Sequence, residues 1–318
     1  MGDIPARIRV IEMGPREGFQ MEPAMIATER KVELIEALAE SGLGTVECAS
    51  FVNPKVVPVM ADAEQTVAAI RRKPGVRYTA LWLNERGLRR AIATGKVDIQ
   101  GFLALNASEA FVARNTGMTL DKEADEQHRW LETYKECGVP VESAGIGSAF
   151  GCNFQGDVPI SKVVEQVGRI RDIAASHGET LKRVNIADTM SWGTPQSVKR
   201  VIGAVRERFP ELGIGLHLHN TRGMAMANAY AGLEMGADEF DTSVAGLGGC
   251  PFAGHKGAAG NLCTEDFVMM CEEMGIQSGV DLERLIEAAR LAERIVGRNL
   301  PGAVMKGGSL SGLRNRRQ

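Results

Sequence analysis

Long hydrophobic runs and a strong positive charge are both missing from this sequence of 318 residues. No run of about 18 apolar residues occurs, so we expect no membrane-spanning helix and no membrane partner. The segment Met1–Arg9 has no apolar core, so we expect no secretory signal peptide. The net charge is −3, so we expect no nucleic-acid partner. These absences predict a soluble protein of the cytoplasm.

The cysteines lack the C-x-x-C spacing of zinc ribbons and redox motifs, and they do not form the pattern of a secreted disulfide scaffold. We therefore expect free thiols. No Gly-x-Gly-x-x-Gly turn follows the first apolar run, and no P-loop occurs, so neither of the common nucleotide-binding loops is predicted. The six cysteines are Cys48, Cys137, Cys152, Cys250, Cys263 and Cys271.

What the sequence does contain is a regular alternation of short apolar runs with helix-length amphipathic segments. Eight strands that alternate with helices imply parallel pairing, and the count of eight favours a (β/α)8 TIM barrel over a doubly wound sheet. We predict a barrel domain over residues 1–262, followed by C-terminal helices and a tail, 263–318, packed on it. The predicted strands are Arg7–Met13, Thr45–Ala49, Arg77–Trp82, Val97–Leu103, Val141–Ile146, Val184–Ala187, Ile214–Leu218 and Phe240–Val244.

The seventh predicted strand ends in His217-Leu218-His219. Strand alternation places both imidazoles on one face, about 7 Å apart along the strand, where ring nitrogens can converge on one metal ion. The alternative interpretation is a hydrogen-bonded pair of core histidines. Because active sites of TIM barrels lie at the carboxyl ends of the strands, we favour a metal site.

Charged side chains mark three other strand ends. Arg16 and Glu17 lie in a Gly-Pro turn after the first strand, where Arg16 can stabilise an oxyanion and Glu17 can bind a metal. Glu47 interrupts an apolar strand, which is costly unless it pairs with an arginine such as Arg16. Asp188 ends the sixth strand and can serve as a base or as an ion-pair partner.

A glycine-rich segment follows the eighth strand, and Cys250 comes directly after it. Glycines suit a mobile loop over an active site. Cys250 is therefore a candidate acid or base, the alternative being an incidental cysteine. Further along, Asn261 offers a side-chain oxygen to a hard metal ion.

With these residues in view, the sequence resembles the 3-hydroxy-3-methylglutaryl-CoA (HMG-CoA) lyase family of the metallolyase TIM-barrel superfamily, over residues 7–296. The most specific motif is Gly246-Leu247-Gly248-Gly249-Cys250-Pro251, because the related condensing enzymes lack this cysteine loop. The segments that carry the resemblance are Arg7–Gly18, Val46–Pro54, Asp188–Pro195, His217–Gly223 and Ser243–Asp266.

The resemblance implies a divalent-metal-dependent cleavage of a 3-hydroxyacyl-CoA, with HMG-CoA as the first choice of substrate and acetoacetate and acetyl-CoA as the products, and with Mg²⁺ or Mn²⁺ as the cofactor. It also implies an acyl-CoA partner, and a homo-oligomer is compatible with it. The implied metal ligands are Glu17, His217, His219 and Asn261. The implied catalytic residues are Arg16, Glu47, Asp188, His217 and Cys250. The implied substrate contacts are Arg16, Gln20, Ser50 and Thr189.

The sequence departs from the family pattern at four places. Glu17 replaces an aspartate, Asn220 replaces an aspartate, Arg222 stands where an aromatic residue is common, and the loop Cys250–Asn261 is about two residues longer. The departures bear on the substrate more than on the reaction. They leave citramalyl-CoA as an alternative substrate, and an isopropylmalate-synthase-like condensing enzyme or a non-catalytic acyl-CoA or metal-binding protein as alternatives of other classes.

Overall fold

The computed structural model describes residues 4–248 and 260–315, and it divides into two compact units. Unit 1 contains Gln100–Phe240, and unit 2 contains Ala6–Ile99 together with the described residues from 241 onward. The predicted domain boundary between residues 262 and 263 stays a prediction.

One sheet of eight strands has the order β3-β2-β1-β10-β9-β8-β5-β4, and β6 and β7 form a separate two-stranded hairpin. The ladders that join β1 to β2, β2 to β3, β4 to β5, β5 to β8 and β8 to β9 are parallel, as the alternation of strands and helices predicts. The strands are β1 (Arg9–Glu12), β2 (Thr45–Ser50), β3 (Arg77–Leu81), β4 (Gly101–Asn106), β5 (Val141–Gly147), β6 (Gly151–Cys152), β7 (Gly156–Asp157), β8 (Arg183–Asp188), β9 (Gly213–Leu218) and β10 (Glu239–Thr242).

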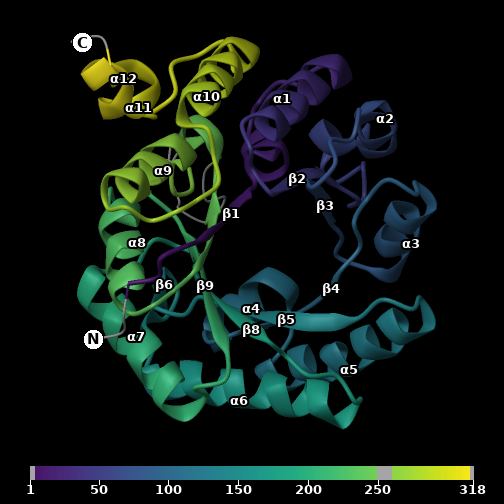
Figure 1. Cartoon of the computed structure of the whole chain (residues 1–318). Helices are drawn as coiled ribbons and strands as arrows, with labels where there is room; N and C mark the ends of the chain where they lie inside the picture. Colours follow the sequence, from purple (N-terminus) through teal and green to yellow (C-terminus); the bar gives the residue numbers. More distant parts are fainter. Residues whose placement is uncertain (1–3, 249–259, 316–318) are drawn as a thin grey trace. The chain divides into compact units, whose positions relative to one another are not determined.

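Helices connect the strands of the large sheet (Figure 1). The α-helices are α1 (Thr28–Glu40), α2 (Ala63–Ala69), α3 (Glu85–Ala93), α4 (Glu109–Thr116), α5 (Leu120–Glu136), α6 (Ile160–Ser176), α7 (Pro195–Arg208), α8 (Ala225–Glu234), α9 (Thr264–Glu273), α10 (Leu282–Val296), α11 (Val304–Gly307) and α12 (Leu310–Asn315). Three short helical turns are η1 (Gly14–Gly18), η2 (Pro58–Met60) and η3 (Val244–Gly246).

In unit 1, α7 shows how the sequence specifies a helix. Thr194 caps it by accepting a hydrogen bond from Ser197 N at 3.2 Å, and Pro195 occupies the first helical position, as predicted. The apolar residues at helical spacing along α7 are all buried. Helices α5, α6 and α7 follow one another along the outside of β4, β5 and β8 (Figure 1).

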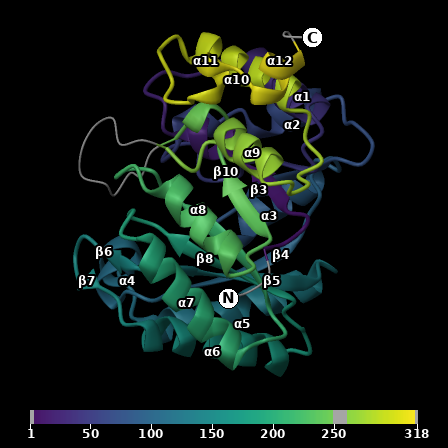
Figure 2. The ribbon, with the colours of Figure 1, turned by 60° about the vertical axis from the view of Figure 1, so that its left-hand side comes forward.

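In unit 2, α1 packs against α10, although the two helices lie far apart in the sequence (Figure 2). Leu34, Ile35 and Leu38 form the buried stripe of α1 that the sequence predicts. Burying each such side chain stabilises the fold by about 1.5–3 kcal/mol relative to leaving it exposed. This packing joins the C-terminal helices to the N-terminal part of unit 2.

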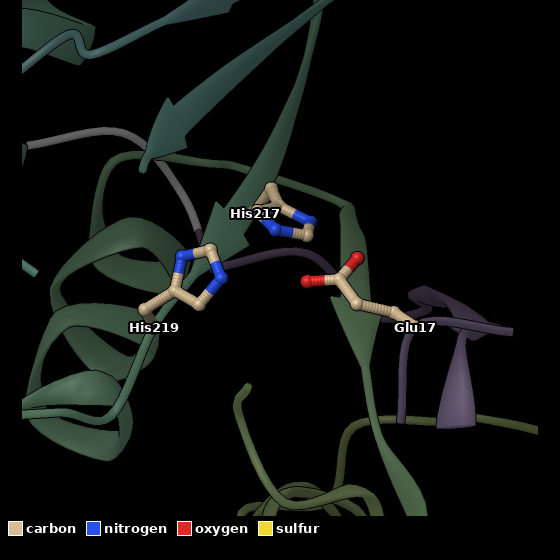
Figure 3. Close-up of side chains that lie close together, drawn as sticks. All are labelled: Glu17, His217 and His219. Atoms are coloured by element: carbon tan, nitrogen blue, oxygen red, sulfur yellow. The ribbon is translucent and has the colours of Figure 1, made fainter. Parts of the chain in front are cut away.

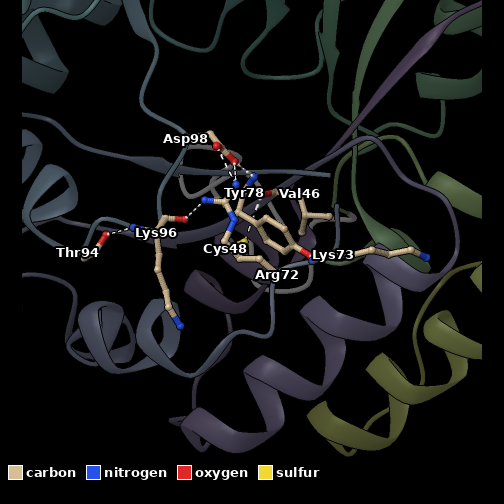
Figure 4. A network of polar contacts seen from close by, with 8 residues as sticks. All are labelled: Val46, Cys48, Arg72, Lys73, Tyr78, Thr94, Lys96 and Asp98. Atoms are coloured by element: carbon tan, nitrogen blue, oxygen red, sulfur yellow. Dashed lines mark hydrogen bonds and ion pairs between the residues drawn. The ribbon is translucent and has the colours of Figure 1, made fainter. Parts of the chain in front are cut away.

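The predicted start of the fourth strand is wrong. The strand begins at Gly101 rather than Val97, because Asp98 is held by the start of β3. Its carboxylate accepts hydrogen bonds from Tyr78 N at 2.6 Å and Arg72 Nη2 at 2.6 Å, and its own backbone N donates to Tyr78 O at 2.8 Å (Figure 4). These contacts leave residues 96–98 outside the strand.

The sequence-based prediction also missed the short elements α4, β6, β7, α11 and α12. Each is shorter than the segment over which hydrophobic periodicity becomes recognisable. Within the described residues, no helix has both the length and the hydrophobicity that crossing a membrane requires.

Candidate active site

The carboxyl end of β9 in unit 1 carries the two histidines singled out from the sequence. Their ring centroids lie 4.9 Å apart, and the rings are steeply tilted relative to one another (Figure 3). His219 is buried, whereas His217 is half-buried. The strand therefore holds two imidazoles side by side, as its alternation predicts.

The tautomer of His219 follows from its hydrogen bond. His219 Nδ1 lies 3.0 Å from the backbone O of Asp188. Because a carbonyl oxygen can only accept, Nδ1 carries a proton, and in the neutral imidazole Nε2 is then the nitrogen with the lone pair. Metal-binding histidines are typically held in this way by a carbonyl or carboxylate at the second nitrogen. The arrangement thus prepares Nε2 to act as a metal ligand.

Asp188 ends β8 and is only 1% exposed. Its Oδ1 accepts hydrogen bonds from Trp192 N at 2.7 Å and Gly193 N at 3.0 Å, and its Oδ2 lies 3.0 Å from the same Gly193 N. Burial raises the pKa of this carboxyl, and the backbone hydrogen bonds only partly oppose that effect. Asp188 is therefore more basic than an ordinary aspartate, which suits a proton acceptor.

In unit 2, the turn after β1 is the helical turn η1, with Pro15 near its start. Arg16 Nε donates a hydrogen bond to Glu47 Oε2, and Arg16 Nη2 lies 3.0 Å from Glu17 Oε2. The predicted pairing of Glu47 with Arg16 is confirmed. Burial would lower the pKa of Arg16, but the carboxylates of Glu47 and Glu17 raise it, so the guanidinium stays charged.

Glu47 is buried together with Arg16. Burial raises the pKa of Glu47, and the adjacent guanidinium opposes the rise. The carboxylate accepts from the Nε edge of the guanidinium and fixes the direction in which the rest of it points. Glu47 can therefore act by orienting Arg16.

Three side chains of unit 2 that the sequence singled out carry buried polar atoms whose hydrogen-bonding capacity the described residues leave unfilled. These atoms are Asn261 Oδ1, Asn261 Nδ2, Ser50 Oγ and Gln20 Oε1. Asn261 is only 1% exposed. A buried polar atom without a partner costs about 1–3 kcal/mol, so such atoms usually bind a ligand, an ion or water. The Asn261 amide therefore fits a role as an oxygen ligand of a hard metal ion.

The structure places the sequence-predicted residues in two groups. Unit 1 holds Asp188, Thr189, His217 and His219, and unit 2 holds Arg16, Glu17, Gln20, Glu47, Ser50 and Asn261. Thr189 Oγ1 accepts a hydrogen bond from Ser148 N at 2.8 Å and so ties the end of β5 to the end of β8. Cys250 lies outside the described residues.

Glu12 is a residue that sequence reasoning missed. It is fully buried at the end of β1. Glu12 Oε1 accepts from Gly14 N at 2.8 Å and Val244 N at 2.9 Å, and Oε2 accepts from Thr264 Oγ1 at 2.6 Å. Burial raises its pKa to about 7 despite these hydrogen bonds. One carboxylate thus joins the turn that bears Arg16 to η3 and to the start of α9.

Glu265 plays a similar part on the other side of η3. It is fully buried, and its Oε2 accepts from Ala245 N at 2.9 Å. Ala245 has a φ of 57°, a left-handed conformation that is unfavourable for alanine and persists only where its surroundings hold it. Burial raises the pKa of Glu265 to about 7 as well. The carboxylates of Glu12 and Glu265 therefore both bind backbone amides of η3.

Comparison with known proteins places this arrangement in a family. The HMGL-like family model matches residues 7–292. The mitochondrial hydroxymethylglutaryl-CoA lyase of Rattus norvegicus is 36% identical over 288 residues, which cover 91% of this chain and 85% of that protein. The cytoplasmic 3-hydroxy-3-methylglutaryl-CoA lyase of Mus musculus is 36% identical over 285 residues, 90% of this chain and 80% of that protein.

Solved structures of HMG-CoA lyases also match this chain. The crystal structure of HMG-CoA lyase from Bacillus subtilis matches with a TM-score of 0.86 and 33% identity, covering 100% of both chains. An HMG-CoA lyase from Acinetobacter baumannii, solved in complex with coenzyme A and 3-methylmalate, matches with a TM-score of 0.84 and 33% identity, covering 98% of both chains. Together with the eight-stranded sheet, these matches confirm the predicted TIM-barrel fold. On the family model and on its identity to these relatives, the chain belongs to the HMGL-like family.

Proposed function

We propose that this protein is a divalent-metal-dependent carbon–carbon lyase that cleaves HMG-CoA to acetoacetate and acetyl-CoA. The observation that carries the proposal is the end of β9, where the carbonyl of Asp188 prepares His219 as a metal ligand beside His217. The proposal is supported by the 36% identity to proteins named hydroxymethylglutaryl-CoA lyase. A relative solved with coenzyme A supports an acyl-CoA substrate.

The proposed metal ligands are His217, His219, Glu17 and Asn261, and Figure 3 draws the first three. The carboxylate and amide oxygens of this set suit Mg²⁺ or Mn²⁺, and His217 and His219 add two imidazole nitrogens. A metal bound there would lower the pKa of a coordinated substrate hydroxyl. Glu17 is one methylene longer than the aspartate usual at this position in the family, so its carboxylate reaches about 1.5 Å further from the backbone.

The proposed reaction is a retro-Claisen cleavage. A base takes the proton of the 3-hydroxyl, the C3–O bond becomes a carbonyl, and the C2–C3 bond breaks to leave the enolate of acetyl-CoA. Asp188 or His217 takes the proton, and the raised pKa of Asp188 supports the first choice. Protonation at C2 completes acetyl-CoA, and we assign that step to Cys250, which lies outside the described residues.

The charge of the enolate needs a fixed positive partner. Arg16 supplies it, because its guanidinium is buried and oriented by Glu47 before substrate arrives. Gln20, Ser50 and Thr189 are proposed to bind polar groups of the substrate. For Gln20 and Ser50 the support is that buried atoms of theirs have no hydrogen-bond partner among the described residues.

The deciding experiment compares HMG-CoA with citramalyl-CoA. The protein is treated with EDTA, and release of acetyl-CoA is followed with no metal, with Mg²⁺ and with Mn²⁺. We expect metal-restored cleavage of HMG-CoA. Preferred cleavage of citramalyl-CoA, which gives pyruvate and acetyl-CoA, would instead identify that thioester as the substrate.

Two outcomes would point to another class. Condensation of acetyl-CoA with a keto acid, without measurable cleavage, would favour a condensing enzyme. Metal or acyl-CoA binding with no turnover of any thioester would leave a binding protein. The proposal also includes a cytoplasmic location and a homo-oligomer, which cell fractionation and sedimentation velocity can test.

A further inference from the structure

Two loops of unit 1, one after β8 and one after β9, are joined by Ser191 and Arg222. Ser191 Oγ donates to the backbone O of His219 at 2.9 Å and accepts from Arg222 N at 3.4 Å. The Arg222 guanidinium donates through Nη1 to the backbone O of Met190 at 2.8 Å and of Ser191 at 2.9 Å. Ser191 of the first loop thus contacts the backbone of the second loop, and Arg222 of the second loop contacts the backbone of the first.

Ser191 adopts a conformation that depends on these contacts. Its φ is 57°, in the left-handed region that disfavours residues other than glycine, and its side chain is buried. A residue persists in such a conformation where the surrounding structure over-determines it. Here that structure is the hydrogen bonds of Ser191 Oγ and the guanidinium of Arg222.

The turn that Ser191 closes determines how His219 is oriented. Ser191 N donates to the backbone O of Asp188 at 3.1 Å, and His219 Nδ1 donates to the same oxygen at 3.0 Å. Loosening of the turn would therefore move a carbonyl that holds the His219 ring through Nδ1. Arg222 lies at an exposed position, yet it holds two carbonyls of this turn.

We propose that Arg222 and Ser191 are positioning residues that fix the His219 ring and thereby strengthen metal binding. The inference rests on the proposed function, in which His219 is a metal ligand. Arg222 acts through the turn and touches neither metal nor substrate in this proposal. An aromatic side chain at this position could not donate to both carbonyls, so the contact is particular to a chain with arginine here.

The test measures metal affinity rather than turnover. The full chain is stripped of metal and titrated with Mn²⁺, and the free ion is measured by its electron paramagnetic resonance signal. We expect Arg222→Met to raise the Kd for Mn²⁺ about tenfold, the lower end of the range for outer partners of metal ligands. Arg222→Lys keeps a cation that can donate to a carbonyl and should recover part of that loss.

A matched control is Arg129→Met. Arg129 is an exposed arginine of unit 1 whose Nη1 bonds Glu126 Oε1 at 2.6 Å within α5. This substitution removes the same charge from the same unit without touching the two loops, so the Kd for Mn²⁺ should not change. Thermal unfolding of the metal-free proteins reports whether any variant is generally destabilised.

Two further variants separate the Ser191 hydroxyl from its backbone conformation. Ser191→Ala removes the hydroxyl and keeps a Cβ at positive φ, whereas Ser191→Gly removes both the hydroxyl and the steric conflict. Both should weaken Mn²⁺ binding relative to wild type. Ser191→Gly should have the higher midpoint of thermal unfolding of the two.

The possible failures are distinguishable. If wild type binds Mn²⁺ tightly and both Arg222→Met and Ser191→Gly bind it equally well, the positioning role is overturned and the proposed function stands. If wild type itself binds no divalent metal, both the inference and the metal-dependent function are overturned. A loss of affinity that is matched by Arg129→Met reports a general charge effect and also overturns the positioning role.

Discussion

The raised pKa of Glu12 makes the stability of this protein depend on pH. Glu12 is fully buried, and among the described residues its hydrogen-bond partners are neutral groups: Gly14 N, Val244 N and Thr264 Oγ1. A glutamine can keep every one of these contacts. Its Oε1 accepts from the two backbone amides, and its Nε2 donates to Thr264 Oγ1, which can turn its own proton to Thr242 Oγ1 at 2.9 Å. Glu12→Gln therefore removes the titratable carboxyl group and keeps its hydrogen bonds.

The sign follows from the direction of the shift. Burial raises the pKa of Glu12 from 4.5 to about 7, so folding favours the protonated form. The stability that this preference contributes is fully present below pH 4.5 and is lost as the pH rises through 7. Between pH 4.5 and pH 7 the free energy of unfolding therefore falls by about 3 kcal/mol, at about 1.4 kcal/mol per pH unit.

The assay is urea unfolding of wild type and Glu12→Gln at pH 5, 6, 7 and 8. We expect the free energy of unfolding of the variant to rise relative to wild type by up to about 3 kcal/mol between pH 5 and pH 8. Glu36→Gln is the control, because hydrogen bonding from Arg71 lowers the pKa of Glu36, so it is already ionised throughout this range. A difference between wild type and Glu12→Gln that does not change with pH would refute the reasoning.

Gly193, Arg16 and Cys263 each have an expected response to substitution or chemical modification. A Cβ at Gly193 would lie 2.7 Å from Asp188 Oδ2, so Gly193→Ala should destabilise the protein by about 1–3 kcal/mol in thermal unfolding and lower the rate of cleavage. Arg16→Lys removes the planar donor set that pairs with Glu47, and kcat in the acetyl-CoA release assay should fall about 100-fold with the circular dichroism spectrum unchanged. Burial raises the pKa of the Cys263 thiol well above its usual value, so iodoacetamide at pH 8 should leave it unmodified in the folded protein and alkylate it in urea, as read by peptide mass spectrometry.

Hydrophobic periodicity predicted most of the fold, because the pattern of α1 and α7 is set by residues close together in the chain. The start of β4 could not be predicted in the same way. Val97 and Asp98 follow the amphipathic helix α3 and resemble the beginning of a strand, but Asp98 bonds to Tyr78, 20 residues earlier. Contacts between distant segments decided that boundary, and a local pattern carries no information about them.

The residues of the candidate site likewise differ in whether local sequence spacing reveals their role. His217 and His219 were recognisable because their spacing alone places them on one face of a strand. Ser191 and Arg222 were not assigned a role in holding loops, because they act through backbone carbonyls and a positive φ. Such contacts depend on the path of two loops, which residue types alone do not reveal.

Glu12 and Glu47 show why a sequence signal must be completed by the identity of the partner. Both are glutamates in apolar strands, and both are buried at a cost that requires compensation. Glu47 is compensated by the cation of Arg16, which opposes the rise of its pKa, and the pair orients a group that can stabilise an enolate. Glu12 is compensated by neutral donors from three elements, so its charge is poorly stabilised and its pKa approaches 7. The first arrangement serves chemistry and the second holds backbone segments together. Only the charge of the partner, which comes from a distant part of the chain, distinguishes them.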